Sequence, residues 1–150
     1  MREGSNLLFA GLLAGILFGD RAGTSPVRPT LSDACFVQYR QGLHVHFVPL
    51  MPILMALCIL SAVVTFALVR RQSKRASAYA LAAAVLSIAV LVLTRAINVP
   101  INQQLMTWTP ASVPPDWLRT WTPWEQAHTI RTAIALTAFI AQLCAAARRD

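Results

Sequence analysis

Long apolar runs, separated by short polar segments, dominate the pattern along the chain. Residues 47–69 and 76–94 contain no charged side chain, and each is long enough for a helix to cross the roughly 30 Å apolar core of a bilayer. A shorter apolar run covers residues 5–19, and another extends from near Trp124 to near Ala147. The pattern therefore predicts an all-α fold with four membrane-spanning helices, at approximately 5–22, 47–69, 76–95 and 125–147.

The first run admits two interpretations. It is short for a membrane span, so a cleavable signal peptide is the alternative. However, the leader MREG is barely basic, and Gly11, Gly15 and Gly19 recur at four-residue spacing. This spacing places a smooth ridge on one helix face, which suits close helix packing in lipid. We therefore favour a retained first span, followed by a loop over residues 20–32, which contain two prolines and several turn-forming residues.

A second helical pattern begins near Ser32 and leads into the second span. Apolar side chains recur every three or four residues among polar ones that include Gln38 and Arg40. These apolar positions are Phe36, Tyr39, Leu43 and Phe47. The spacing predicts an amphipathic helix whose apolar face contains Tyr39.

The composition supports a membrane protein. Of the 150 residues, 56% are hydrophobic and only 13% are charged, which is too few to cover the surface of a soluble globule. The formal net charge of +7 does not indicate nucleic acid, because the basic residues flank apolar runs and form no basic stripe. The three cysteines, Cys35, Cys58 and Cys144, fall at different predicted depths and contain no CxxC motif, so we expect no disulfide.

The distribution of cations predicts the orientation. If the loop at residues 70–75 is cytoplasmic, both termini are cytoplasmic too, and the two long loops lie outside. The cations on the inner side are then Arg2, Arg70, Arg71, Lys74, Arg75, Arg148 and Arg149. This density of positive charge on short segments agrees with the positive-inside rule. The expected architecture is an integral membrane up-down four-helix bundle, in the cell membrane, with elaborated outer loops.

Polar residues gather at the predicted outer end of the third and fourth helices. Arg95, Asn98 and Asn102 recur at intervals of three and four, so they share one face if the third helix continues past Pro100. Three residues of the fourth helix recur in the same way, namely Trp124, His128 and Arg131. Because polar residues at a membrane edge are costly, we expect these two walls to face each other across a pocket, under a Pro/Trp lid at residues 107–123.

Other interpretations of these residues exist. Arginines and tryptophans at the ends of spans often serve as interfacial anchors, and the two asparagines could cap the third helix. Glu125 and His128 have the spacing of a di-iron half-motif, but no span supplies the further carboxylates that such a site needs. His44, His46 and His128 are the remaining candidates for a metal or haem site, with copper as the metal.

The combined motif resembles that of a known family. The segment NVPIN at residues 98–102, followed by the W-x-x-x-H-x-x-R spacing of Trp124, His128 and Arg131, is similar to the anthrone oxygenase-like family of small four-span membrane proteins. The resemblance covers nearly the whole chain and extends more loosely to Arg95. It implies that a polyketide anthrone is oxidised to an anthraquinone by dioxygen, with no obvious cofactor.

Such a reaction fits the residue types. Neutral His128 would act as the base, and Arg131, Arg95, Asn98 and Asn102 would stabilise the substrate anion and the peroxide. A planar, hydrophobic aromatic substrate would contact a set of aromatic and polar side chains. We expect this set to comprise Trp108, Trp117, Trp121, Trp124, Tyr39 and Gln38. The expected partners are therefore this small molecule, dioxygen and the lipid bilayer, with no nucleic acid.

Three questions stay open at this point. The chain could be a membrane enzyme of related fold with different small-molecule chemistry, including metal- or haem-assisted chemistry. It could also be a non-enzymatic transporter or assembly protein. Small multidrug transporters need an acid within a span, and residues 5–19, 47–69, 76–94 and 132–147 contain none. The sequence also leaves open whether the protein forms a homo-oligomer.

Overall fold

The computed structural model describes residues 3–148, with side chains from Leu7 onward. The expectations for Arg2 and Arg149 therefore lie outside the described residues. The elements are α1 (Glu3–Gly19), η1 (Asp20–Thr24), η2 (Ser25–Thr30), α2 (Asp33–Val69), α3 (Lys74–Leu93), η3 (Thr94–Asn98), α4 (Val99–Leu105) and α5 (Trp117–Ala146). The described part of the chain is all-α and contains no strand, as predicted.

Four helical stretches are long and apolar enough to cross a membrane. Their bounds are Leu7–Thr30, Asp33–Val69, Lys74–Leu105 and Trp117–Ala146. The protein is thus a four-helix membrane protein, although each stretch extends beyond the span expected from the apolar run alone. The third stretch, for example, continues through η3 and α4, and the fourth begins at Trp117, well before Trp124.

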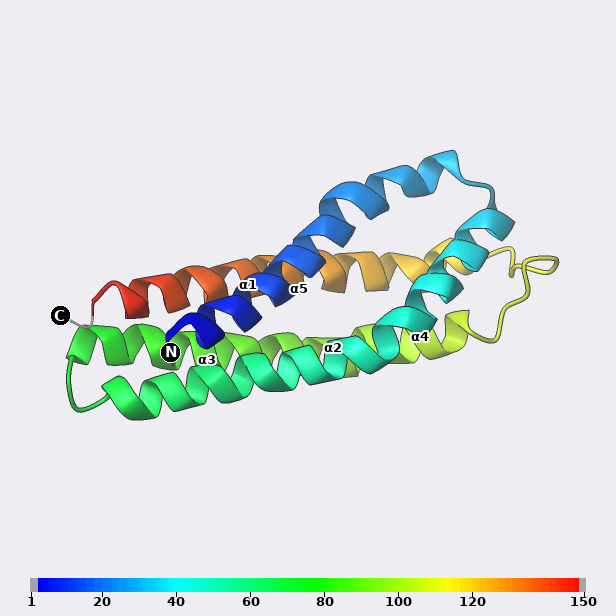
Figure 1. Ribbon diagram of the computed structural model, residues 1–150. Helices are drawn as coiled ribbons and strands as arrows, with labels where there is room; N and C mark the ends of the chain where they lie inside the picture. The colour runs from blue at the N-terminus through cyan, green and yellow to red at the C-terminus, as the bar shows by residue number, and fades with distance from the viewer. Residues whose placement is uncertain (1–2, 149–150) are drawn as a thin grey trace.

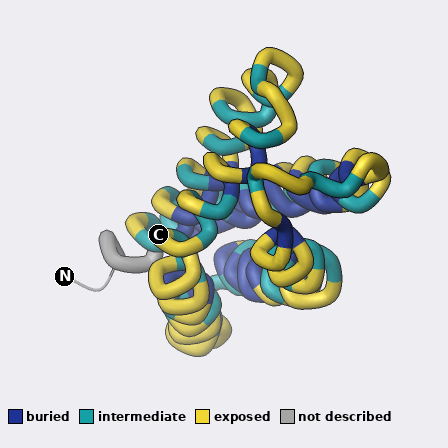
Figure 2. Tube along the Cα trace, turned by 90° about the vertical axis from the view of Figure 1, so that its right-hand side faces the viewer, coloured by how far each residue is buried: buried dark blue, intermediate teal, exposed yellow. Residues whose placement is uncertain are grey.

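The helices form a bundle in which each contacts two neighbours. α5 packs against α3 and α1, and α2 packs against the same two helices from the other side. Figure 1 shows the α2–α3 turn and both ends of the described chain at one end of the bundle, with the α4–α5 loop at the other. Buried residues face the axis between the helices, whereas exposed residues cover the outside (Figure 2). Many of the exposed residues are large and apolar, as expected of a surface in contact with lipid.

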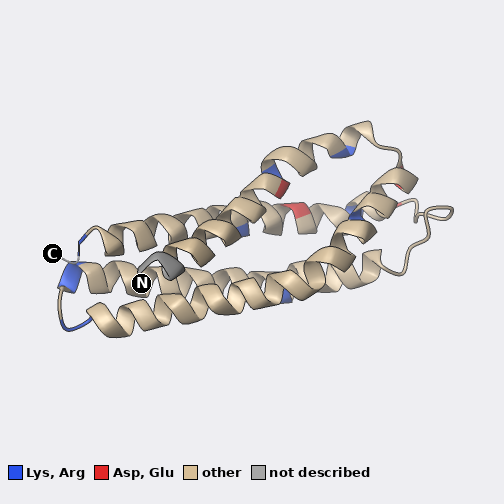
Figure 3. Cartoon of the chain, viewed as in Figure 1, with Lys and Arg blue, Asp and Glu red and all other residues tan. Residues whose placement is uncertain are grey.

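Charge is distributed unevenly along the bundle. Figure 3 shows one group of cations at the end that holds the α2–α3 turn and further cations spread along the rest of the bundle, whereas the acids lie in the half away from that turn. Arg70, Arg71, Lys74 and Arg75 belong to this turn and its flanks. The three cysteines are free, with Cys58 buried and Cys35 exposed.

Residues 20–30, which the sequence predicts as a loop, are helical instead. α1 continues as a π-helical turn, η1, and then as a 3-10 segment, η2, before the chain turns at Leu31 into α2. Ser32 caps α2, since its hydroxyl accepts from the backbone nitrogen of Cys35. This extension places Asp20 well inside the first candidate span, ten residues before its end at Thr30.

The glycine ridge on α1 contributes to packing at one position. A Cβ atom on Gly11 would lie 3.3 Å from Cε2 of Phe139 on α5, which is closer than ordinary contact. The same atom on Gly15 or Gly19 would meet nothing within 4 Å. α1 thus approaches α5 closely at Gly11, and Ala10, Leu13, Ala14 and Leu17 supply the rest of its buried face.

Two π-helical turns occur at matching places in the first and third candidate spans. In each, the first residue accepts a backbone hydrogen bond from a residue five positions later: Ser25 bonds to Asp20, and Val99 bonds to Thr94. A proline follows each turn, at Pro26 and at Pro100. A proline ring within a helix clashes with the carbonyl group four residues earlier, and a wider turn relieves that clash. The third helix therefore continues through Pro100 without ending.

Candidate functional site

His128 is the centre of a buried polar network. Its side chain is only 1% exposed, and each ring nitrogen faces a charged group. The Nε atom of Arg131 donates a hydrogen bond of 3.0 Å to Nδ1. On the other side of the ring, Nε2 lies 3.1 Å from Oδ2 of Asp20. The imidazole therefore bridges a guanidinium from its own helix and a carboxylate from the first candidate span.

Arg40 of α2 pairs with the same carboxylate. Its Nη1 donates to Oδ1 of Asp20 at 3.0 Å and to Oδ2 at 3.4 Å. The Arg40 side chain is only 6% exposed, and buried charges are costly unless they are paired. Together with Arg131, the network holds two cations and one anion around the imidazole. It carries one net positive charge when the imidazole is neutral, which favours binding of an anion.

Two tryptophans pack against the guanidinium groups. The rings of Trp121 and Trp124 stack with their centroids 4.4 Å apart. The guanidinium carbon of Arg40 lies 4.5 Å from the centroid of Trp124, and that of Arg131 lies 5.5 Å from it. The His128 ring is 4.9 Å from the same centroid. Aromatic faces attract cations, so the tryptophans help to hold two like charges in one buried site.

Asn98 and Trp124 add polar atoms to the site. The Nδ2 atom of Asn98 donates to the backbone oxygen of Trp124 at 3.2 Å, and the Asn98 side chain is completely buried. Oδ1 of Asn98 and Nε1 of Trp124 are buried and have no hydrogen-bond partner among the described residues. Because buried polar atoms are nearly always satisfied, this acceptor and this donor are available to a polar group of a ligand or to water.

The two π-helical turns supply partners to α5. Asp20, the first residue of η1, contacts His128. Thr94, the first residue of η3, accepts a hydrogen bond of 3.2 Å from Nη1 of Arg131. Such turns are frequent at functional sites because they shift side chains out of the regular helical register. The first residue of each turn thus contacts one residue of α5: Asp20 contacts His128, and Thr94 contacts Arg131.

The sequence matches a known protein family over most of its length. The model of the family described as anthrone oxygenase matches residues 38–141, which is more than half of the chain. The chain belongs to the anthrone oxygenase family. It matches no curated protein and no solved structure. Family membership points to oxygenase activity, and hence to a small-molecule substrate and dioxygen, in a multi-pass membrane protein.

The structure brings together most of the residues that the family motif singles out. Asn98, Trp124, His128 and Arg131 are all buried and connected by the contacts described above. The two walls meet directly, because Asn98 bonds to the backbone of Trp124, so they do not stand apart across an open space. Arg95 is exposed, outside this cluster of motif residues, and Asn102 is only partly buried.

The C-terminal part of the expected lid is helical. α5 begins at Trp117, so Trp117 and Trp121 lie on it and pack with Phe36. Trp108 is buried in the same hydrophobic cluster. Tyr39 is 45% exposed, and Arg40 occupies the buried face of α2 in its place, contrary to the apolar pattern. Gln38 is exposed.

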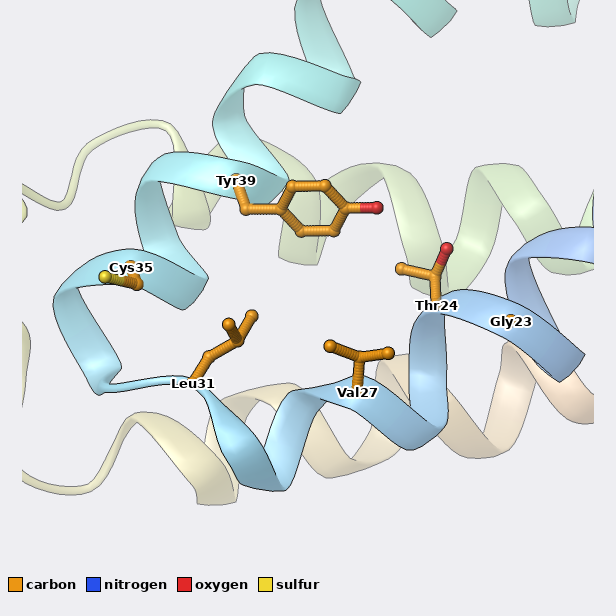
Figure 4. Close-up of a pocket in the computed structure, with 6 residues that line it drawn as sticks. All are labelled: Gly23, Thr24, Val27, Leu31, Cys35 and Tyr39. Carbon is orange, nitrogen blue, oxygen red and sulfur yellow. The ribbon is translucent and has the colours of Figure 1, made fainter.

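An apolar pocket lies on the elements that carry Asp20 and Arg40. It has a volume of about 400 Å³ and is formed by η1, η2 and the first turns of α2. Figure 4 shows the side chains of Thr24, Val27, Leu31 and Tyr39 around this space. Its walls share η1 with Asp20 and α2 with Arg40. Its volume is within the range of small-molecule sites, about 300–1,000 Å³.

The three histidines considered as alternative metal ligands do not form a cluster with one another. The described residues contain no group of three or more His, Cys, Asp or Glu side chains that could hold a metal ion. His44 and His46 lie on α2, and His46 is exposed. Glu125 pairs with Arg28 at 2.8 Å and accepts a hydrogen bond from Nε1 of Trp121.

Sequence reasoning missed Asp20, Arg40 and Thr94. The sequence pattern predicts Asp20 at the start of a loop. It predicts Arg40 on the polar face of a helix and Thr94 at the end of a span. One signal was present: Asp20 and Thr94 each precede a proline by six residues, at Pro26 and Pro100. This repeated spacing corresponds to the two π-helical turns.

Proposed function

We propose that this member of the anthrone oxygenase family oxidises a hydrophobic, planar aromatic small molecule with dioxygen. The observation that carries the proposal is the completely buried His128, held between Arg131 and Asp20. Ionisable groups inside a membrane span are costly and usually functional. An imidazole that can take a proton, beside guanidiniums that can bind the resulting anion, suits chemistry on an acidic carbon.

The first step is a proton transfer. An anthrone carries a CH₂ group that is activated by two aromatic rings and, through them, by a carbonyl group. His128 takes one proton from this carbon, and the electron pair of the broken C–H bond spreads onto the carbonyl oxygen. The oxyanion binds Arg131, which moves from the imidazole to the substrate. General bases of this kind typically contribute about 10²–10⁴-fold to a rate.

The second step needs no further group to carry electrons. The electron-rich anion passes one electron to dioxygen, and the two radicals combine to form a C–O bond. The resulting peroxide loses its outer oxygen as water, with the remaining hydrogen of the original CH₂ and the proton taken up by His128. One oxygen atom stays on the substrate, one leaves in water, and dioxygen accepts the electrons that the carbon loses.

Buried donors support both charged stages. Nε1 of Trp124 and the guanidinium of Arg131 can donate to the enolate oxygen or to the peroxide, whereas Nδ2 of Asn98 already donates to the backbone oxygen of Trp124. A preorganised donor of this type is worth about 2.7–4 kcal/mol where it has been measured. Arg95 is exposed, so we assign it no direct contact with the substrate.

The surroundings suit an apolar substrate. Such a molecule concentrates in the bilayer and can reach the network through the pocket lined by Val27, Leu31 and Tyr39. We infer from the cations at the α2–α3 turn that this turn and both termini face the cytoplasm, so that the pocket lies towards the outer face of the cell membrane.

The test is oxidation of a simple anthrone by the full-length protein in lipid nanodiscs. Dioxygen uptake and anthraquinone absorbance are followed together, with empty nanodiscs to correct for spontaneous oxidation. We expect His128→Ala and His128→Gln to reduce turnover to the background rate. Glutamine keeps a donor and an acceptor near Asp20 and Arg131 but cannot take the proton. His46→Gln, which changes an exposed histidine on α2, should retain full activity.

Turnover that survives in a folded His128→Gln protein would remove the base assignment. A wild-type protein that is folded but inactive on anthrones would contradict the substrate class. Stoichiometric metal or a haem absorbance band that is required for activity would contradict the direct reaction with dioxygen.

A further inference from the structure

The hydrogen bond to Nδ1 of His128 identifies which ring nitrogen carries the proton. Nδ1 accepts a hydrogen bond from Nε of Arg131, and a guanidinium can only donate. Nδ1 therefore has no proton of its own in the neutral ring. The single proton of the neutral imidazole must be on Nε2, which faces Oδ2 of Asp20 at 3.1 Å.

Asp20 is well suited to hold this proton in place. A carboxylate only accepts hydrogen bonds, so it favours the tautomer that directs N–H towards it. Arg40 keeps the carboxylate in position, with Nη1 3.0 Å from Oδ1, and supplies the opposite charge. Arg40 in turn lies against the stacked rings of Trp121 and Trp124. Arg40 thus holds in position the carboxylate that faces His128.

We propose that Asp20, anchored by Arg40, is a positioning residue that keeps the His128 proton on Nε2 and makes Nδ1 the basic atom of the site. The position of the proton does not depend on the proposed function. Only the reaction in which Nδ1 then takes up a substrate proton rests on it. Asp20 lies outside the residues matched by the family model, which begin at residue 38, so the motif alone does not indicate it.

The assignment has a mechanistic consequence. Nδ1 is occupied by Arg131 in this structure, so a substrate reaches the basic atom only when the guanidinium moves aside. The developing oxyanion of the substrate provides the charge that draws Arg131 away. When Nδ1 then takes the substrate proton, Asp20 stabilises the imidazolium through Nε2.

The decisive measurement is the tautomer of His128. Full-length protein with ¹⁵N-labelled histidine is studied by NMR in nanodiscs, and the signals of His44 and His46 are assigned by replacing each with glutamine. We expect wild-type His128 to be protonated on Nε2 only. In Asp20→Asn, the amide oxygen can pair with Arg40 and the amide NH₂ then faces Nε2. The proton should therefore move to Nδ1, at least in part.

Glu125→Gln is the matched control. Glu125 also pairs with an arginine, Arg28, but its carboxylate has no hydrogen bond or ion pair with His128 among the described residues. Its replacement removes the same charge and should leave the His128 tautomer unchanged. If Asp20 served only the fold, the two substitutions would affect the tautomer alike.

Kinetics give the second readout. Asp20→Asn should lower kcat by about a hundredfold or more with little change in KM, because the base is misoriented while the substrate site is intact. The inference is overturned if wild-type His128 carries its proton on Nδ1, or if Asp20→Asn leaves the tautomer unchanged. The NMR result stands whether or not anthrones are substrates, so failure of the inference and failure of the proposed function can be told apart.

Discussion

Arg40 and Asp20 form an ion pair between two candidate membrane spans, with Nη1 of the arginine 3.0 Å from Oδ1 of the aspartate. The arginine is almost completely buried and the aspartate side chain is 19% exposed. In an apolar environment, either charge would be costly without the other as its partner. The pair therefore links the end of α1 to the first turns of α2, beside the tryptophans of α5.

We expect Arg40→Met to destabilise the protein strongly. Removing one partner of a buried ion pair leaves the other charge uncompensated, at a cost of roughly 3–5 kcal/mol. Unfolding of the detergent-solubilised protein by heat or by a denaturing detergent would measure the loss. Asp20→Asn alone should also destabilise, whereas the double variant should lose less than the sum of the two. Strictly additive losses would show that the two side chains do not interact.

The fold could be predicted from sequence because its signals are local. Apolar runs of sufficient length define the four spans, and their type does not depend on how they pack. Trp124, His128 and Arg131 could also be grouped, since they lie one and two turns apart on a single helix. Asn98 could be added because the family motif links it to these residues.

Asp20 and Arg40 could not be predicted in the same way. Their contacts join three different helices, and the rotation of one helix against another is set by packing, not by spacing within either. The π-helical turn at Asp20 shifts the register further, and no regular periodicity reveals it. On α2, the apolar pattern indicated that Tyr39 would face inward, but the tryptophan stack attracts Arg40 instead.

The close approach of α1 to α5 at Gly11 gives another test. Gly11→Leu should destabilise by about 1–3 kcal/mol, because the new side chain must displace Phe139. Gly15→Leu is the control: a Cβ atom there meets nothing within 4 Å, and leucine has the higher helix propensity. Unfolding of both variants in the same detergent gives the comparison. Equal stability would mean that α1 does not approach α5 at this point.

The pocket between η1, η2 and α2 can be filled without touching the charged network. Val27 lines this pocket, so Val27→Trp should hinder an apolar substrate and raise KM severalfold while kcat stays close to that of the wild type. Val45→Trp places the same side chain on an exposed position of α2 that does not line the pocket and should change neither constant. If both variants behave like the wild type, the substrate takes another route.

The orientation of the bundle can be tested with single cysteines. In a background in which Cys35, Cys58 and Cys144 are replaced by alanine, Ser112→Cys is placed in the exposed α4–α5 loop and Gln72→Cys in the exposed α2–α3 turn. Because the cations of that turn should stay in the cytoplasm, a membrane-impermeant maleimide added to intact cells should label Ser112→Cys at once. Gln72→Cys should be labelled only after the membrane is permeabilised. The reverse pattern would place the candidate site on the cytoplasmic side, whereas labelling of both positions in intact cells would indicate mixed orientation.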